Sequence, residues 1–249
     1  LQAHPWFEIS ELAASEKSAG KTYESAMEGR WKVSANIPEK IKKIKVMECK
    51  PNLNCKIVFS ALDSSVAGPI EEEFARNGYA VSSNSKNHRM DDDVPLLIPE
   101  VNPEHLSIIK KQKERFGKGF IVTNPNCAAI GLVIALKPLH DTFGIKKVFV
   151  NTMQALSGAG YPGVASLDIL DNVVPYISGE EEKIETESLK LLGKIQNDKF
   201  NFAGIKISAQ CSRVNVKDGH LENVNLELGK KTGIDGIKSA FKNFNPLKK

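Results

Sequence analysis

The sequence predicts an α/β domain with a mostly parallel sheet over residues 1–125, followed by an α+β domain over residues 126–249. In the first half, short apolar runs alternate with helical stretches, which is the pattern of βαβ units. From Asn126 onward the pattern changes to long helical stretches and strands of alternating polarity. A chain of 249 residues is long enough for two modest domains, so the division is also reasonable in size.

The first domain contains apolar runs of strand length, separated by turn residues and by helix start and stop signals. The continuous apolar run at 55–61 is typical of a buried parallel strand. Asn102 is a suitable N-cap for a helix that begins at Pro103. In chain order, we expect a strand at 7–9 with Leu12, a polar loop at 14–23, a strand at 55–61, a helix at 69–76 that ends at Asn77-Gly78, a strand from Tyr79, a helix at 103–117 and a strand at 120–123.

The second domain is expected to begin with a helix and to contain one further long helix. The first helix is expected to stop at Lys137-Pro138, because proline disrupts a helix interior. Asp218-Gly219 divides two alternating segments and predicts a hairpin with a two-residue turn. In chain order, we expect a helix at about 128–136, a strand at 147–153, a helix at 180–195 and a two-stranded hairpin at 213–228.

The composition argues against several classes of protein. The net charge is only +4 and the basic residues are scattered, so nucleic-acid binding is not expected. No apolar run reaches the ~18 residues of a membrane helix and no signal pattern is present, so we expect no membrane partner and a cytoplasmic location. The four cysteines form no CxxC pair, so we expect free thiols and no metal site.

Cys127 carries the strongest local signal for chemistry. The strand at 120–123 runs into Asn124-Pro125-Asn126, so the cysteine lies at or beside the start of a helix. Unpaired N–H groups and the positive end of the helix dipole favour a thiolate there and can hold an oxyanion. The position therefore predicts a lowered pKa and a nucleophilic role for Cys127, against the alternative of a buried structural cysteine.

A nucleophilic thiol needs a partner for proton transfer, and this partner is usually histidine. Among the five histidines, His220 is the best placed, because it follows Asp218-Gly219 at the head of a strand. In a two-residue hairpin Lys217 would face His220, and Arg213 would lie ~13 Å along the strand on the same side. An acid/base group and a carboxylate-binding cation would suit a small anionic substrate. A solvent-exposed histidine beside an unrelated arginine fits the spacing equally well.

A series of motifs in a fixed order extends these observations along the chain. They are ASEKSAGK at 14–21, VFSALDSSVAG at 58–68, SNSKNHRMDDDVPLLIPEVN at 83–102, TNPNCAAIG at 123–131, QALSGAGYPG at 154–163, GEEEKIETESLKLLG at 179–193 and QCSRVNVKDGH at 210–220. Together they resemble the aspartate-β-semialdehyde dehydrogenase family, in particular its archaeal and fungal branch. The resemblance runs from the first residue to about residue 229.

The resemblance implies a role for five residues in catalysis and substrate binding. Cys127 matches the nucleophile that forms a thiohemiacetal and then an acyl-thioester. His220 matches the general acid/base, and Gln154 matches the residue that orients the intermediate. Arg213 and Glu180 match the groups that bind the α-carboxylate and the α-amino end of the substrate.

The resemblance also implies a phosphate or acyl-phosphate site formed by Arg89, Lys183 and Asn126. Glu180 and Lys183 are i,i+3 neighbours in the first turn of a helix, so both can face one cleft. Arg89 and Lys183 are expected in different domains, and we expect them to converge beside Cys127 in a cleft between these domains.

The cofactor implied by the resemblance is NADP. Lys17 and Ser18 match the loop that meets the adenosine ribose phosphate, and Ser157 and Gly158 match the segment that holds the nicotinamide half. NAD-specific folds commonly carry an acidic residue at this position. Lys17 and Ser18 instead provide a cation and a hydroxyl, which also favours NADP. The first domain is thus expected to be Rossmann-like and NADP-binding, and the second to serve catalysis and dimerisation.

Both domains are expected to be incomplete in this chain. The resemblance implies that a strand and a glycine-rich dinucleotide motif belong before residue 1, and that a C-terminal helix of the family belongs after residue 249. Without the helix start that binds pyrophosphate, we expect the affinity for the cofactor to be low.

The predicted function is NADPH-dependent reduction of β-aspartyl phosphate to aspartate β-semialdehyde and phosphate, in the biosynthesis of lysine, threonine and methionine, by a homodimer or homotetramer. One alternative is a paralogous acyl-CoA reductase of the malonyl-CoA type, although Glu180 and Arg213 favour an amino-acid substrate. Another is a truncated, non-catalytic subunit or interaction module. The missing glycine motif favours that module, and the intact Cys127 and His220 count against it.

Overall fold

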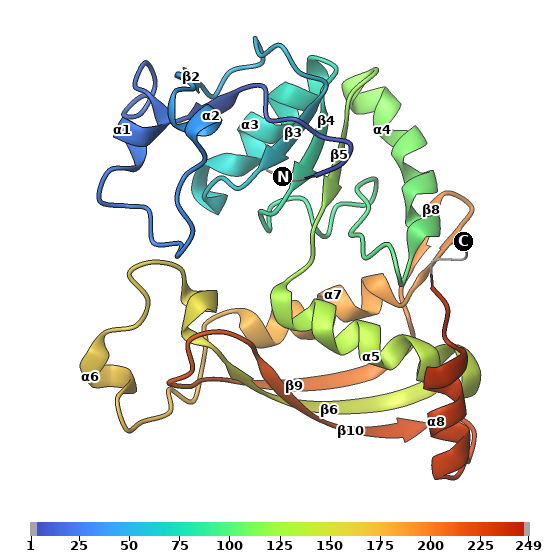
Figure 1. Ribbon diagram of the computed structural model, residues 1–249. Helices are drawn as coiled ribbons and strands as arrows, with labels where there is room; N and C mark the ends of the chain where they lie inside the picture. Colours follow the sequence, from blue (N-terminus) through green and yellow to red (C-terminus); the bar gives the residue numbers. More distant parts are fainter. Residues whose placement is uncertain (1–3, 247–249) are drawn as a thin grey trace. The chain divides into compact units, whose positions relative to one another are not determined.

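The computed structural model describes residues 4–246 (Figure 1). The chain forms two compact units. The first consists of the residues up to Ser85 together with Gln112–Ile121, and the second of Lys86–Lys111 together with the residues from Val122 onward. We predicted a single boundary near residue 125. The segment 86–111 precedes that boundary but packs with the second unit. Among the described residues, no helix is long and apolar enough to cross a membrane.

Parallel strands form the first part of the chain, in agreement with the predicted α/β class. β1 (Leu12–Ala14) pairs in parallel with β2 (Val46–Glu48). β3 (Ile57–Ser60) pairs in parallel with β4 (Ala80–Ser83), and β5 (Phe120–Thr123) completes a sheet with the order β3-β4-β5. The helices are α1 (Tyr23–Met27), α2 (Glu39–Lys42), α3 (Ser64–Arg76), the 3-10 helix η1 (Pro103–Ile108) and α4 (Ile109–Phe116).

Local capping determines where α3 begins. The side chain of Asp63 accepts a hydrogen bond of 2.8 Å from the backbone N–H of Ser65, so the helix starts directly after Asp63. The predicted start at Pro69 is therefore wrong, and Pro69 lies inside the helix. The first strand also differs from the prediction, because β1 begins at Leu12 and the segment 7–9 is not a strand.

Two further expectations for this region are corrected. The run at 55–61 is not a fully buried strand: Ile57 and Phe59 are 42% and 51% exposed, because β3 lies at the edge of the sheet that the described residues form. Asn102 is the N-cap residue of the helix that follows it, as predicted, but its side chain makes no capping hydrogen bond. Its side chain instead accepts from the N–H of Ile98 and donates to the carbonyl of Leu96, and the first turns after it are a 3-10 helix.

The second unit contains a mixed sheet with β6 (Ile145–Gln154) at its centre. β6 pairs antiparallel with β10 (Leu221–Leu228) and parallel with β9 (Lys206–Arg213). The other elements are α5 (Cys127–Phe143), the 3-10 helix η2 (Leu156–Ala159), α6 (Ser166–Ile169), α7 (Glu180–Leu191), the strand pair β7 (Lys194–Gln196) and β8 (Lys199–Asn201), and α8 (Ile234–Asn243). This mixture of helices and a mixed sheet confirms the predicted α+β class.

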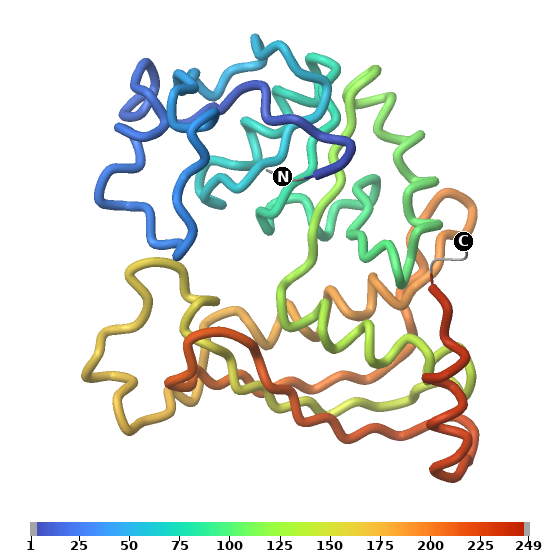
Figure 2. Tube along the Cα trace, in the orientation of Figure 1, coloured from blue at the N-terminus to red at the C-terminus, as the bar shows by residue number. Residues whose placement is uncertain are grey.

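The predicted hairpin at 213–228 is wrong. β9 and β10 do not pair with each other, because they lie on opposite sides of β6, and the segment between them crosses the end of the sheet, as the chain trace shows (Figure 2). The helix α5 also passes through Pro138, where the sequence predicts a stop. Leu136 and Leu139 on either side of the proline are buried, and this packing stabilises the helix beyond it. Helix α7 ends at Leu191, earlier than predicted.

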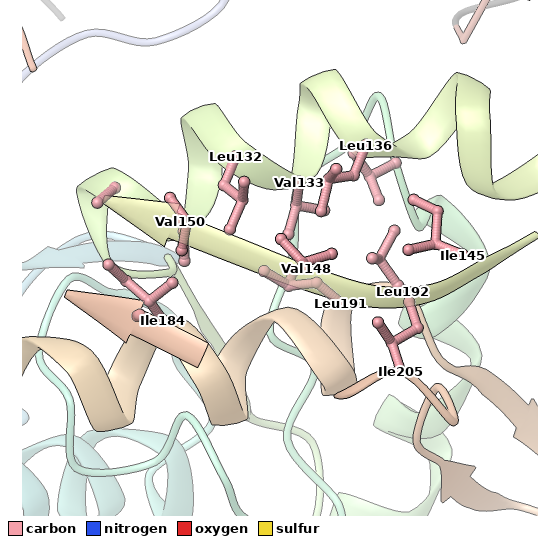
Figure 3. Packing of buried hydrophobic residues seen from close by; sticks show 14 of the residues in the cluster. Leu132, Val133, Leu136, Ile145, Val148, Val150, Ile184, Leu191, Leu192 and Ile205 are labelled. Atoms are coloured by element: carbon pink, nitrogen blue, oxygen red, sulfur yellow. The ribbon is translucent and has the colours of Figure 1, made fainter. Parts of the chain in front are cut away.

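The core of the second unit lies between the sheet and the helices α5 and α7, which cover one of its faces (Figures 1 and 3). Leu132 and Leu136 of α5, Val148 of β6 and Ile184 of α7 are buried in this cluster. Each such side chain contributes about 1.5–3 kcal/mol when it is fully buried. Helix α5 is therefore held firmly on the sheet, and with it the residue at its start.

The other face of this sheet is open in the described chain. Phe149 at its centre is 58% exposed, and its neighbours across the strands, Asn225 on β10 and Ser208 on β9, point to the same side. A largely exposed aromatic side chain surrounded by small polar residues is typical of a surface that binds another protein.

Candidate active site

Cys127 is the first residue of α5, as the local sequence predicts. Asn126 is the N-cap, and its side-chain oxygen accepts hydrogen bonds from the N–H groups of Ala128 and Ala129 at 3.0 and 3.2 Å. Asparagine suits this position because its side chain replaces the missing helical partners of these N–H groups. Cys127 is exposed as a whole residue, but protein groups partly surround its thiol at the start of a rigidly packed helix.

The imidazole of His220 faces this thiol. Nε2 lies 3.2 Å from Cys127 Sγ, and Nδ1 accepts a hydrogen bond of 3.0 Å from the backbone N–H of Ala155. A backbone N–H can only donate, so Nδ1 must be unprotonated and the neutral ring carries its proton on Nε2. His220 therefore directs an N–H donor toward the sulfur.

The expected lowering of the Cys127 pKa is not found. Burial raises the pKa of the thiol, and the carboxylate of Glu180 raises it further. The N–H groups at the start of α5 and the guanidinium of Arg213 act in the opposite direction but are weaker. Burial and then Arg213 lower the pKa of His220, so its neutral form is favoured.

Arg213 is brought to the same place by the fold, although not along a hairpin. It is the last residue of β9, it is buried, and its Nη1 donates to the carbonyl of Ala155 at 2.8 Å. Ala155 thus binds His220 through its N–H and Arg213 through its C=O. The predicted separation of ~13 Å along one strand does not apply, because the segment after β9 crosses the end of β6.

Glu180, at the start of α7, connects three polar side chains of the site. Its carboxylate accepts from Lys183 at 2.6 Å, from the side chain of Asn126 at 2.8 Å and from Gln154 at 3.4 Å. Burial alone would raise the pKa of Glu180, but these hydrogen bonds outweigh it and hold the pKa below its ordinary value. Glu180 therefore remains ionised in the site beside Cys127.

Arg89 and Lys183 both lie in the second unit, so the expected cleft between two domains is not needed to bring them together. Arg89 is buried, and its Nη1 donates to Glu187 at 2.9 Å. The other oxygen of Glu187 accepts from the backbone N–H of Asn126 at 2.6 Å. Each cation is therefore connected to Asn126, next to Cys127, through a single carboxylate.

A cavity of about 580 Å³ opens beside the cysteine and histidine pair, and its lining includes Cys127, Ser157, His220 and Glu222. Burial raises the pKa of Glu222 to about 7. Glu222 is the second residue of β10, two residues after His220, and its carboxylate faces Gly131 of α5.

The sequence interpretation missed two of these acids, Glu187 and Glu222. Their spacing contained a signal in each case. Glu187 follows Glu180 by two helical turns on α7, and Glu222 follows His220 by two residues, the spacing that places side chains on one side of an extended chain.

The residues expected to contact NADP lie in both units. Lys17 is exposed and Ser18 is half-buried in the turn that follows the parallel strand β1. Ser157 and Gly158 belong to η2, and Ser157 lines the cavity beside Cys127. An exposed ammonium and a hydroxyl in a turn after a parallel strand fit a ribose phosphate chemically.

Comparisons with known proteins agree for both parts of the chain. Residues 1–109 match the family model described as "Semialdehyde dehydrogenase, NAD binding domain", and residues 136–248 match "Semialdehyde dehydrogenase, dimerisation domain". The aspartate-semialdehyde dehydrogenase of Archaeoglobus fulgidus is 51% identical and that of Candida albicans 45% identical. The matches cover 99% and 98% of this chain, and 72% and 71% of those relatives.

Solved structures show the same similarity. The crystal structure of aspartate-semialdehyde dehydrogenase with NADP from Candida albicans has a TM-score of 0.88 and 43% identity, over 98% of this chain and 71% of that chain. Aspartate-semialdehyde dehydrogenase II from Vibrio cholerae, complexed with ASA, has a TM-score of 0.72 and 26% identity, over 94% of this chain and 70% of that chain.

Proposed function

Because this chain belongs to the aspartate-semialdehyde dehydrogenase family, we propose that it reduces β-aspartyl phosphate to aspartate β-semialdehyde and phosphate with NADPH. The observation that carries the proposal is the placement of the Cys127 thiol at a helix start, 3.2 Å from a neutral imidazole whose donor nitrogen faces the sulfur. The reaction belongs to the biosynthesis of lysine, threonine and methionine. In the cytoplasm, where thiols remain reduced, Cys127 would stay available as the nucleophile.

In this mechanism the sulfur of Cys127 attacks the acyl carbon, and phosphate leaves to give an acyl-thioester. The thiol first gives up its proton to solvent, and the Nε2–H of His220 donates a hydrogen bond to the thiolate that then attacks. Because this N–H faces the sulfur, His220 can also donate a hydrogen bond, without losing its proton, to the oxyanion of a tetrahedral intermediate beside Cys127. Gln154 is placed to orient the intermediate, since it is buried and bound to Glu180. NADPH, when bound, supplies the hydride that reduces the thioester.

The charged groups around the pair match the two ends of the substrate. Glu180 is ionised and suits the α-amino group, and Arg213 suits the α-carboxylate. Arg89 and Lys183, both connected to Asn126, suit the phosphate. The guanidinium provides paired donors for two oxygens, and the ammonium provides a point charge.

For the cofactor we propose NADP, with Lys17 and Ser18 at the ribose phosphate and with Ser157 and Gly158 at the nicotinamide half. The exposed ammonium of Lys17 and the position of Ser157 beside Cys127 support this assignment. We further propose that the open face of the sheet around Phe149 forms a homodimer, either alone or within a homotetramer. Its exposed aromatic residue supports this.

The proposed function is tested by NADPH formation in the oxidative direction, from aspartate β-semialdehyde and NADP+. We expect turnover with inorganic phosphate and none with coenzyme A in its place. We expect none from Cys127→Ala, which removes the nucleophile. Turnover that requires coenzyme A would support an acyl-CoA reductase, and binding of NADP without turnover in either assay would support a non-catalytic subunit.

A further inference from the structure

Helix α7 carries four charged residues on one stripe, with spacings of three and four residues. They are Glu180, Lys183, Glu187 and Lys190. The first two are part of the site described above. The proposed mechanism gives Glu187 and Lys190 no role, although both are among the most deeply buried charged residues of the described chain.

Glu187 forms a bridge between two parts of the site. It is 3% exposed, and each of its carboxylate oxygens has a different partner. One oxygen accepts from Nη1 of Arg89 at 2.9 Å, and the other accepts from the backbone N–H of Asn126 at 2.6 Å. One carboxylate therefore fixes the Arg89 guanidinium relative to the turn that begins the helix of Cys127.

Lys190 holds the backbone of the same segment one helical turn further along. Its Nζ donates to the carbonyl oxygens of Arg89, Asp91 and Val94 at 2.8, 2.8 and 2.9 Å. It also lies 4.2 Å from the ring centroid of Phe200. Three carbonyl acceptors match the three donors of an ammonium, so this buried cation is fully satisfied. Glu187 thus binds the side chain of Arg89, and Lys190 binds its backbone.

We propose that Glu187 and Lys190 are positioning residues, which hold Arg89 at the distance from Cys127 that an anion between them requires. The proposal rests on the proposed function, because that function gives Arg89 its role toward phosphate. Burying charge is expensive compared with apolar packing of the same volume, so two charges directed at one arginine indicate a requirement for its position. The anion they serve is inorganic phosphate or the phosphate of the acyl phosphate.

Two measurements test this, one of them independent of turnover. In the first, iodoacetamide alkylates Cys127 at increasing concentrations of inorganic phosphate. A phosphate bound beside the sulfur slows the reaction and gives an apparent Kd. In the second, steady-state turnover gives the KM for phosphate and the KM for the semialdehyde separately.

Glu187→Gln has the same shape as the wild-type side chain but cannot accept from both partners. We expect the Kd and the KM for phosphate to rise about fivefold to tenfold, as for the loss of one charge-assisted hydrogen bond. The KM for the semialdehyde is expected to stay within about twofold. Glu187→Asp keeps the charge and is expected to fall between the wild type and Glu187→Gln in its affinity for phosphate.

The matched control is Glu182→Gln, on the exposed side of the same helix, which should leave both phosphate constants unchanged. Lys190→Met retains the aliphatic part of the side chain. We expect it to weaken the binding of phosphate, as Glu187→Gln does, and to leave the KM for the semialdehyde nearly unchanged. Should it fail to fold, Glu187→Gln alone decides the question.

The possible failures are distinguishable. An unchanged Kd and KM for phosphate in Glu187→Gln would overturn the positioning proposal. A parallel loss of phosphate affinity, semialdehyde affinity and Tm would also overturn it, because such a loss indicates a purely structural role. Protection of wild-type Cys127 by phosphate without NADP-dependent turnover would contradict the proposed function and leave the comparison of variants valid. No effect of phosphate on the wild type in either assay would overturn both.

Discussion

Gly158 leaves little space for a side chain next to Arg213: a Cβ on this glycine would lie 3.0 Å from Nη1 of the guanidinium and 3.2 Å from Cε1 of His220. Neither neighbour can move freely, because Arg213 and His220 are both bound to the backbone of Ala155. The absence of a Cβ therefore lets the backbone of η2 lie close to both side chains.

Gly158→Ala is therefore expected to displace Arg213 or His220 by a few tenths of an ångström or more. Misplacement of this kind weakens catalysis, and we expect kcat/KM to fall at least about tenfold. Steady-state kinetics and the Tm of the variant check this. Gly204→Ala is the control, since a Cβ there has no neighbour within 4 Å, and a similar loss of activity in both variants would contradict the argument.

The thiol of Cys127 is expected to ionise at a higher pH than an ordinary cysteine in the ligand-free protein, because burial and Glu180 raise its pKa. Glu180→Gln removes the neighbouring negative charge, so the midpoint of iodoacetamide alkylation against pH should move to lower pH. Mass spectrometry assigns the labelled cysteine. Glu182→Gln provides the comparison, and a midpoint that Glu180→Gln leaves in place would refute the electrostatic influence of Glu180.

Arg213→Lys tests whether the guanidinium binds a carboxylate through paired hydrogen bonds. Lysine keeps the charge but cannot reproduce the two parallel donors, so we expect kcat/KM for the semialdehyde to fall by at least about tenfold. The same change removes a donor to the Ala155 carbonyl. Kinetics close to those of the wild type would exclude the paired contact.

Glu222 is expected to make the protein less stable as the pH rises. Its folded pKa, about 7, lies above the ordinary glutamate value of 4.5, so the folded state binds more protons between these pH values. The free energy of unfolding that this group contributes is present in full below about pH 4.5 and is lost as the pH rises to about 7.

Glu222→Gln removes this loss. When the pH is raised from 5 to 8, the free energy of unfolding of the variant should increase relative to that of the wild type by on the order of 1–2 kcal/mol, after allowance for solvent screening. Urea unfolding at the two pH values measures the difference. A gain that is equal at both pH values would show that titration of Glu222 is not its cause.

The start of α5 could be predicted because its signals are local. A strand, a proline and an asparagine cap stand directly before Cys127, and these residues act within one turn. The pKa of the same thiol could not be predicted in this way. Burial and Glu180 decide it, and Glu180 is more than fifty residues away in the sequence.

The strand order could not be read from the sequence for a similar reason. Alternating polarity indicates that 221–228 is a strand, but it does not specify which strand it pairs with, and Asp218-Gly219 suggested a local partner. The contact between Arg89 and Glu187 joins positions 98 residues apart, which no local pattern reveals. The sequence therefore predicted the elements, and the approach of His220 to Cys127, better than the connections between the elements.

The crossing of the segment 214–217 over the end of β6 also has a consequence for how the molecule folds. Val214 bonds to the Gln154 carbonyl, and the N–H groups of Leu156 and Ser157 bond to the carbonyls of Val216 and Lys217. We expect these contacts to form only after β6 has paired with β9, because that pairing closes a loop of about fifty residues and such distant pairings form slowly. His220 follows this crossing directly, so we expect its imidazole to reach the Cys127 thiol late in folding. We expect reactivity toward a substrate to appear only after the sheet has closed, whereas α5 itself can form early.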